Sequence, residues 1–195
     1  MIRLTRDGVI TALLVVAALF VGSLVAERMP DPAAVLDRPF ERHAGIGAPV
    51  PMRTGTLTVT GIRSGTQVSS YLDIAATQGV WLVADVEWMP TTEAFPLNAH
   101  AARVVAADGR RYGGTSEIAT GCTRTQAGVT FGCALAFEMA PTALAGAALH
   151  VAASSSVDDA DDVAVIDLGL DAAGAAALAS AAGRVVLAEP HVKEP

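Results

Sequence analysis

The stretch VWLVADVEWM, residues 80–89, decides the fold class of this chain. Successive side chains of a strand point to opposite faces, so Leu82, Val86 and Trp88 share one face, while Asp85 lies on the other. We expect the face that carries Trp88 to point into a hydrophobic core. Pro90 ends the strand because proline has no N–H to donate to a neighbouring strand.

A second strand is predicted in VTFGCALAFEM, residues 129–139, with Phe131, Cys133 and Phe137 on one face and Pro141 at its end. Short strands that recur at this spacing predict an all-β sandwich. The other expected strands lie at residues 55–61, 68–74, 101–106, 147–153, 163–168 and 185–188, with a turn at Gly65, a break at Gln78 and Gly79, and a hairpin return through Tyr112 after Asp108 and Gly109.

One short helix is expected near the C-terminus, over residues 171–183 (DAAGAAALASAAG). Asp171 suits the N-cap of this helix, because its carboxylate can accept hydrogen bonds from the first free backbone N–H groups. Gly183 suits its end.

The N-terminal segment VITALLVVAALFVGSLVA, residues 9–26, carries no charge and as a helix would extend about 27 Å, enough to cross the hydrocarbon of a bilayer. Arg3 and Arg6 precede it, so its N-terminal end is expected to stay in the cytoplasm. A retained anchor is favoured, because the apolar run is longer than that of most cleaved signal peptides and Leu24 stands where a signal peptidase prefers a small residue. Cleavage near Ala26 is the alternative.

Four parts of the chain follow from these patterns. Residues 1–26 are the cytoplasmic tip and transmembrane anchor, or a signal peptide. Residues 27–53 mix proline, glycine and charge without a period and are expected to form a stalk. Residues 54–190 are expected to form an extracytoplasmic β-sandwich domain, and residues 191–195 a tail.

The two cysteines, Cys122 and Cys133, lie in the part expected outside the membrane, where thiols pair. We interpret them as one structural disulfide that joins a polar loop to the strand at 129–139. Free thiols are the alternative. A metal pair or redox dithiol is disfavoured, because it would require CxxC spacing or nearby histidines.

The strands GTLTVTGI and WLVADVEW, the segment VVAADGRRY and the strand VTFGCALAFEMAP together resemble bacterial telokin-like, immunoglobulin-like extracellular domains of unknown function. The resemblance covers about residues 55–153. It implies an immunoglobulin-like β-sandwich behind an anchor or signal sequence, and it implies no activity. The segment 171–188 and the two cysteines are not part of the shared pattern.

No catalytic, cofactor-binding or metal-binding residues are predicted. The histidines (His43, His100, His150 and His191) are dispersed, and Ser154 to Ser156 lack the GxSxG context of a nucleophile. Asp158, Asp159, Asp161 and Asp162 lack the spacing of a calcium loop, so a solvated turn is preferred to a calcium site.

The formal net charge of −7 provides no basic stripe for phosphates, so nucleic-acid binding is not expected. Residues 9–26 are the expected membrane contact. The favoured function is a non-enzymatic, membrane-anchored interaction module of the bacterial cell envelope, which binds an unknown envelope protein or component. A carrier of a small apolar ligand, anchored or secreted, and an envelope hydrolase with an atypical site remain as alternatives.

Overall fold

The computed structural model describes residues 6–29, 39–71, 73–91, 94–113, 118, 120–152 and 162–193. The chain divides into two units, residues 1–38 and 39–195. The first holds a single described helix and the second all of the described strands, so each unit is treated by itself.

The helix of the first unit is α1, Arg6–Arg28. Its described side chains are exposed along the whole length, and apolar residues occupy every side of the helix. Residues 7–28 are long and apolar enough to cross a membrane, a test that a signal sequence also passes. The N-terminal apolar helix that the sequence predicts is therefore present.

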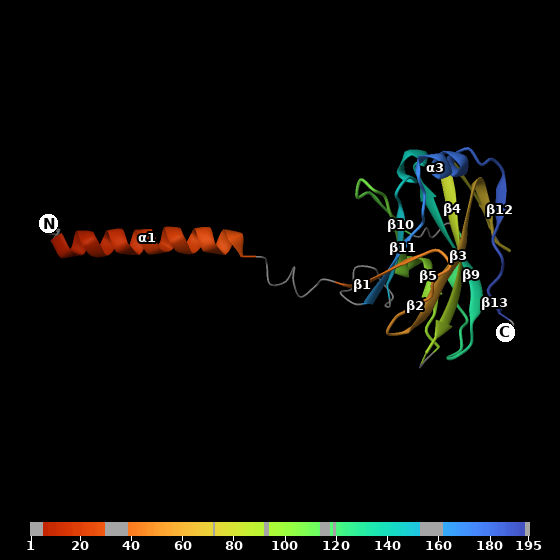
Figure 1. Ribbon diagram of the computed structural model, residues 1–195, viewed down its shortest axis with the longest axis horizontal. Coiled ribbons are helices and arrows are strands. Elements are labelled where there is room, and N and C mark those ends of the chain that lie inside the picture. Colours follow the sequence, from red (N-terminus) through yellow and green to blue (C-terminus); the bar gives the residue numbers. More distant parts are fainter. Residues whose placement is uncertain are drawn as a thin grey trace. The chain divides into compact units, whose positions relative to one another are not determined.

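The second unit contains two main sheets, which are visible in Figure 1. Among the described strands, neighbours are antiparallel except for two pairs, β1 with β11 and β12 with β3. The first sheet has the order β1 (Phe40–Gly45), β11 (Asp162–Asp167), β10 (Ala148–Ala152), β6 (Ala102–Val105), β7 (Arg111–Gly113). The second has the order β12 (Arg184–Val186), β3 (Gly55–Ser69), β4 (Ile74–Pro90), β9 (Phe131–Met139), β13 (His191–Val192), with β2 (Val50–Pro51) beside β3.

The remaining elements are short. Strands β5 (Leu97–Asn98) and β8 (Gly121–Cys122) pair with each other, and two 3-10 helices, η1 (Ala99–Ala101) and η2 (Pro141–Ala143), connect strands. Helix α3 (Ala172–Ala179) is the short C-terminal helix that the sequence predicts. Its N-cap is Asp171, whose Oδ1 accepts a hydrogen bond from the backbone N–H of Gly174 at 2.7 Å.

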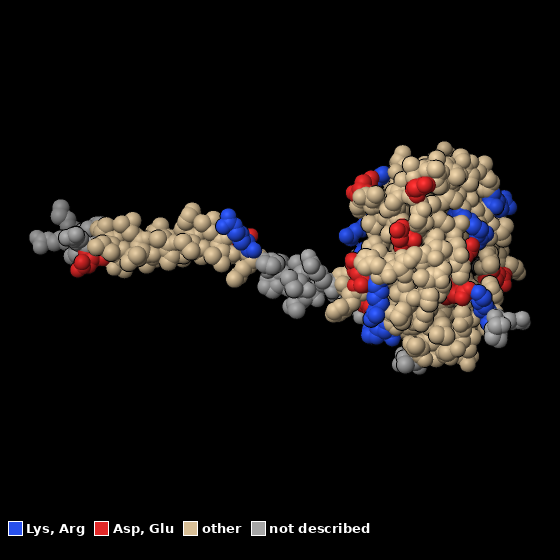
Figure 2. All heavy atoms as spheres, in the orientation of Figure 1, with Lys and Arg blue, Asp and Glu red and all other residues tan. Residues whose placement is uncertain are grey.

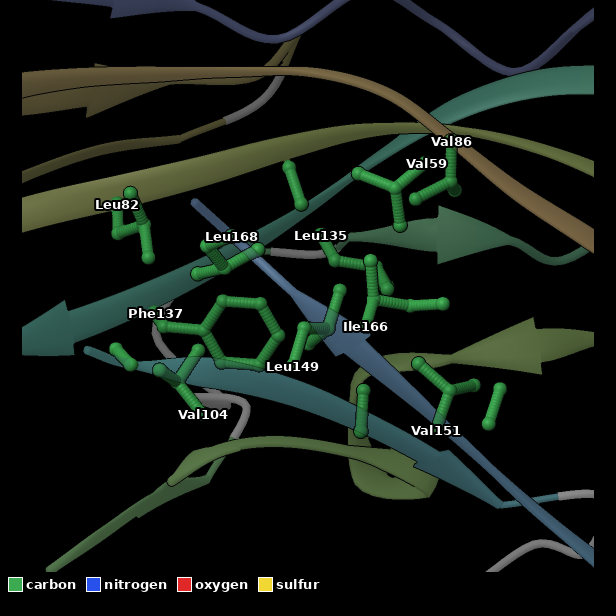
Figure 3. Packing of buried hydrophobic residues seen from close by; sticks show 14 of the residues in the cluster. Val59, Leu82, Val86, Val104, Leu135, Phe137, Leu149, Val151, Ile166 and Leu168 are labelled. Atoms are coloured by element: carbon green, nitrogen blue, oxygen red, sulfur yellow. The ribbon is translucent and has the colours of Figure 1, made fainter. Parts of the chain in front are cut away.

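The main hydrophobic core lies between the two sheets. Phe137 and Leu82 from the second sheet pack in one cluster with Leu149 and Ile166 from the first, and all four side chains are fully buried. Figure 3 shows these residues converging from strands that are far apart in the sequence. The inward face predicted for residues 80–89 and 129–139 is therefore confirmed.

The opposite face of β4 is also buried over its first half. Trp81 and Val83 are fully buried in a second cluster, which Val185 and Leu187 from the C-terminal segment complete. The sheet is thus covered on both faces here. The period-two pattern of the sequence does not reveal this second layer, because the covering residues lie about 100 positions later in the chain.

The structure corrects the predicted end of the stalk. Residues 40–45 and 50–51, which the sequence assigns to a stalk over 27–53, form β1 and β2 and belong to the second unit. Every side chain of β1 except Ala44 is exposed, so the strand has no apolar alternation to detect. Backbone pairing with β11 holds it in place.

Two predicted interruptions in the second sheet are wrong. Strand β3 continues through Gly65, and β4 continues through Gln78 and Gly79. The pairing register shifts between Gly65 and Gln67, so these residues produce an irregularity within the strand pair and do not end either strand. The reversal instead lies between Ser69 and Ile74.

The end of the chain also differs from expectation. The helix ends at Ala179, before Gly183, whose carbonyl accepts hydrogen bonds from the N–H groups of Thr66 and Gln67. The strand expected at 185–188 is present as β12. His191 and Val192, predicted to belong to a tail, form β13 against β9.

Candidate functional site

The predicted disulfide is present. Cys122 in β8 and Cys133 in β9 are bonded, with their Cα atoms 5.5 Å apart and a sequence separation of 11. Both residues are buried. The bond ties the strand pair β5–β8 to the second sheet, and together with the N-terminal apolar helix it indicates an extracytoplasmic location.

Two of the four histidines, His43 and His150, lie near each other although they are far apart in the sequence. His43 on β1 and His150 on β10 both pair with Val165 on β11, from opposite sides, so they flank it on the outer face of the first sheet. Burial lowers the pKa of His150, and the nearby positive charge of Arg103 lowers it further. Among the described residues, no group of three or more His, Cys, Asp or Glu is arranged to hold a metal.

The acidic cluster is only partly described. Asp158, Asp159 and Asp161 lie outside the described residues, as do Ser154 to Ser156. Asp162 is buried at the start of β11. Its Oδ1 accepts a hydrogen bond from Nε of Arg42 at 2.6 Å, and its Oδ2 accepts one from the backbone N–H of Arg53 at 2.9 Å.

The outer face of β4 carries two ion pairs beyond its buried half. Arg63 donates from Nε and Nη2 to the two carboxylate oxygens of Asp85, both at 2.7 Å, and this contact raises the pKa of Arg63. Lys193 pairs with Glu87. An open groove of about 520 Å³ runs beside these pairs and is also lined by His191. Both carboxylates have cationic partners, so neither is a free general base.

Charged side chains are interspersed over the visible face of the domain. Figure 2 shows acidic and basic groups as separate small patches on a mostly uncharged surface. On this face no stripe of one sign marks a site for a highly charged partner.

Large apolar side chains are exposed at several places on the second unit, including Phe40 on β1 and Val192 on β13. Three of them lie together at the tip of the β3–β4 hairpin. Tyr71 is 83% exposed and Ile74 is 61% exposed, and Val186 on the neighbouring β12 is 65% exposed. Ile74 and Val186 both pair with Ser69, from opposite sides, so their side chains lie on the same face of the sheet. We call Tyr71, Ile74 and Val186 the tip patch.

The tip patch lies far along β3 from the point where the chain enters the domain. Strand β3 begins at Gly55, two positions after Arg53, which contacts Asp162 beside β1. Its 15 residues then run to Ser69, a contour of about 46 Å at 3.3 Å per residue. Figure 1 shows β1 and β12 on opposite sides of this domain.

Sequence reasoning missed the tip patch because it placed the turn at Gly65. Ser70 and Asp73 form the turn without glycine or proline, by mutual hydrogen bonds. The N–H of Ser70 donates to the Asp73 carbonyl, and the N–H of Asp73 donates to the Ser70 hydroxyl. This serine and aspartate pair was the available signal.

No family model, curated protein or solved structure matches this chain.

Proposed function

We propose that this protein is a membrane-anchored interaction module of the cell envelope, with α1 as a retained single-pass anchor and an immunoglobulin-like β-sandwich outside the membrane. The tip patch is the surface that we assign to partner binding. The observation that carries this proposal is the exposure of Tyr71, Ile74 and Val186 together at one end of the domain, whereas Phe40 and Val192, the other strongly exposed apolar residues, lie on separate edge strands.

The membrane orientation is supported by the charges that flank α1. Arg3 and Arg6 precede the apolar run, while its C-terminal flank, with Glu27, Arg28 and Asp31, has no positive excess. The helix of 23 residues extends about 34 Å, which suits a span better than the short apolar region of a cleaved signal. The disulfide fits an oxidising exterior.

The packing of the core favours an interaction module over a carrier. Phe137, Leu149 and Ile166 fill the centre of the space between the sheets, as Figure 3 shows, and each is fully buried. A carrier would need that space for its apolar ligand. The groove beside Glu87 and Lys193 lies on the outside of the second sheet, and its ion pairs favour a structural role over hydrolysis.

Site-specific photo-crosslinking of the full chain in its native membrane tests the proposal. A benzophenone amino acid replaces Tyr71 in one variant and the exposed Arg111, on an edge strand of the first sheet, in a control variant. We expect a discrete protein adduct from position 71 and none from position 111. Equal adducts from both positions, or none from position 71, would contradict the proposal.

A further inference from the structure

The two edges of the β3–β4 hairpin differ at its tip. On one, the closed edge, another strand pairs with the outward backbone groups, and on the other, the open edge, no described strand does. Ser70 and Asp73 form a hydrogen-bonded pair at the turn. Hydrogen-bonded and non-hydrogen-bonded pairs alternate along antiparallel strands, so the N–H and C=O groups of Ile74 and Ala76 point away from β3. The N–H and C=O groups of Ser69 and Gln67, the residues paired with them on β3, point away from β4.

The closed edge lies on the β3 side. The carbonyl of Ser69 accepts a hydrogen bond from the N–H of Leu187 at 2.8 Å, and the N–H of Gln67 donates to the carbonyl of Gly183 at 3.1 Å. The segment that contains β12 therefore satisfies the outward groups of β3 at the tip.

The open edge lies on the β4 side. Pairing between β4 and β9 ends at Val80 and Met139, so β4 extends past the end of β9 toward the tip. Within the described part of the chain, no strand pairs with Ile74 or Ala76 on the side away from β3. Their backbone donors and acceptors there form a short template for another strand.

The open edge lacks the features that usually protect sheet edges. Residues 74–79, IAATQG, include no charge and no proline. The other edge strands of the two sheets carry such residues: Glu41 and Arg42 on β1, Arg111 on β7, Arg184 on β12, Pro51 on β2, and Lys193 directly after β13.

Acidic side chains flank the open edge. Asp73 precedes it, and Glu138 accepts a hydrogen bond from the hydroxyl of Thr77. Both residues are exposed, and neither has an ion-pair partner among the described residues. A segment that pairs with this edge would therefore gain from Lys or Arg at its ends.

The same acids disfavour a second copy of this chain as the occupant. Antiparallel pairing of two copies about Ala75 would place Asp73 of each opposite Thr77 of the other, beside Glu138. Like charges would then meet twice. An edge of about five residues is also too short to bury the roughly 1,200–2,000 Å² of a stable globular interface, whereas it matches a short extended peptide.

Resting on the interaction function proposed above, we infer that the edge of β4 at residues 74–78 binds an extended, largely apolar peptide segment of another protein with basic residues at its ends. The segment adds as a strand to β4. The N–H and C=O groups of Ile74 and Ala76 bond its backbone, the exposed side chain of Ile74 contacts its apolar side chains, and Asp73 and Glu138 pair with its basic ends.

Binding of a fluorescent Lys-Val-Thr-Val-Thr-Val-Lys peptide to the full chain in lipid nanodiscs tests this inference. We expect saturable binding and slower amide hydrogen exchange at Ile74 and Ala76. Ala76→Pro should weaken binding about tenfold or more, since it removes an outward N–H, whereas the matched variant Ala76→Val should bind normally. The Asp73→Asn, Glu138→Gln double variant should bind the peptide several-fold more weakly.

A peptide with N-methylated valines tests the same hydrogen bonds without changing the protein, and it should not bind. The inference is overturned if the peptide fails to bind, or if Ala76→Pro and N-methylation leave binding unchanged. It is also overturned if sedimentation shows self-association through this edge instead. If position 71 crosslinks to a protein but the peptide does not bind, only the strand addition is overturned. If position 71 forms no protein adduct, the proposed interaction function is overturned as well.

Discussion

Arg42 and Asp162 join the first strand of the domain to β11, with Nε of Arg42 donating to Oδ1 of Asp162 at 2.6 Å. Only 6% of the Asp162 side chain is exposed, against 51% of that of Arg42. The second carboxylate oxygen accepts the N–H of Arg53, so one buried side chain holds β1 and the segment after β2. The first strand of the second unit is thus fastened by a specific polar contact.

Asp162→Ala should lower the free energy of unfolding by about 1–3 kcal/mol, because it leaves the backbone N–H of Arg53 without this acceptor and removes the contact that holds β1. Urea denaturation measures the change, and amide exchange in β1 should accelerate. Asp108→Ala is the control. Asp108 is exposed and pairs with Arg110, so this variant should unfold like the parent. Equal stability of both variants would show that Asp162 does not fasten β1.

Gly55→Ala should destabilise the domain by about 1–3 kcal/mol through overpacking. A Cβ at Gly55 would lie 2.6 Å from Cη2 of the buried Trp88 and 2.7 Å from the carbonyl oxygen of Met89. Gly61→Ala is a matched control in the same strand, because no atom lies within 4 Å of the Cβ position there. Thermal unfolding of the two variants should separate them clearly. Equal melting temperatures of the two variants would contradict the close packing of Gly55 against Trp88.

The Cys122→Ala, Cys133→Ala double variant should lose about 3 kcal/mol of stability, since the disulfide no longer restricts the unfolded chain. Reduction of the parent protein should produce the same shift in the urea midpoint. Reductant should have no effect on the double variant, which makes it the control. A reduced parent that is as stable as the oxidised protein would contradict a stabilising role.

Stability should fall as the pH drops below about 6.5, partly because of His150. Its pKa is lower in the folded state, so the unfolded chain takes up the proton first. The stability that neutral His150 provides is present above the unfolded pKa and is lost as the pH falls through the folded pKa. Arg103, Arg111 and His43 oppose protonation, and Glu41 favours it.

The His150→Gln variant tests this pH dependence, because it keeps a polar side chain that does not titrate. The melting temperature of the parent should drop more steeply than that of the variant between about pH 7.5 and about pH 5, the range over which histidine titrates. Parallel melting curves for parent and variant across this range would show that His150 contributes nothing to it.

The strands that could be predicted are those whose sequence contains both an alternating pattern and an end signal. Residues 80–89 and 129–139 alternate and are followed by Pro90 and Pro141, and both appear as strands with the expected inward face. Strand β1 has neither feature. Its pairing with β11 involves residues about 120 positions away, which no local pattern can reveal.

The tip patch was missed for a related reason. Gly65 is the local turn signal, but Thr66 and Gln67 bond to the carbonyl of Gly183, which keeps β3 extended past it. The reversal then moves to Ser70 and Asp73. Tertiary contact with a segment from the end of the chain thereby decides where the hairpin turns and which residues are exposed.

The central claim is that α1 is retained as an anchor and holds the domain outside the membrane. Intact-mass measurement of the chain in the membrane fraction, before and after protease treatment of spheroplasts, tests it most directly. We predict a membrane-bound chain that still contains residues 1–26 and that external protease cuts between α1 and β1, leaving the N-terminal helix in the membrane. A soluble chain that starts near Glu27, or a membrane-bound chain that external protease does not reach, would contradict the claim.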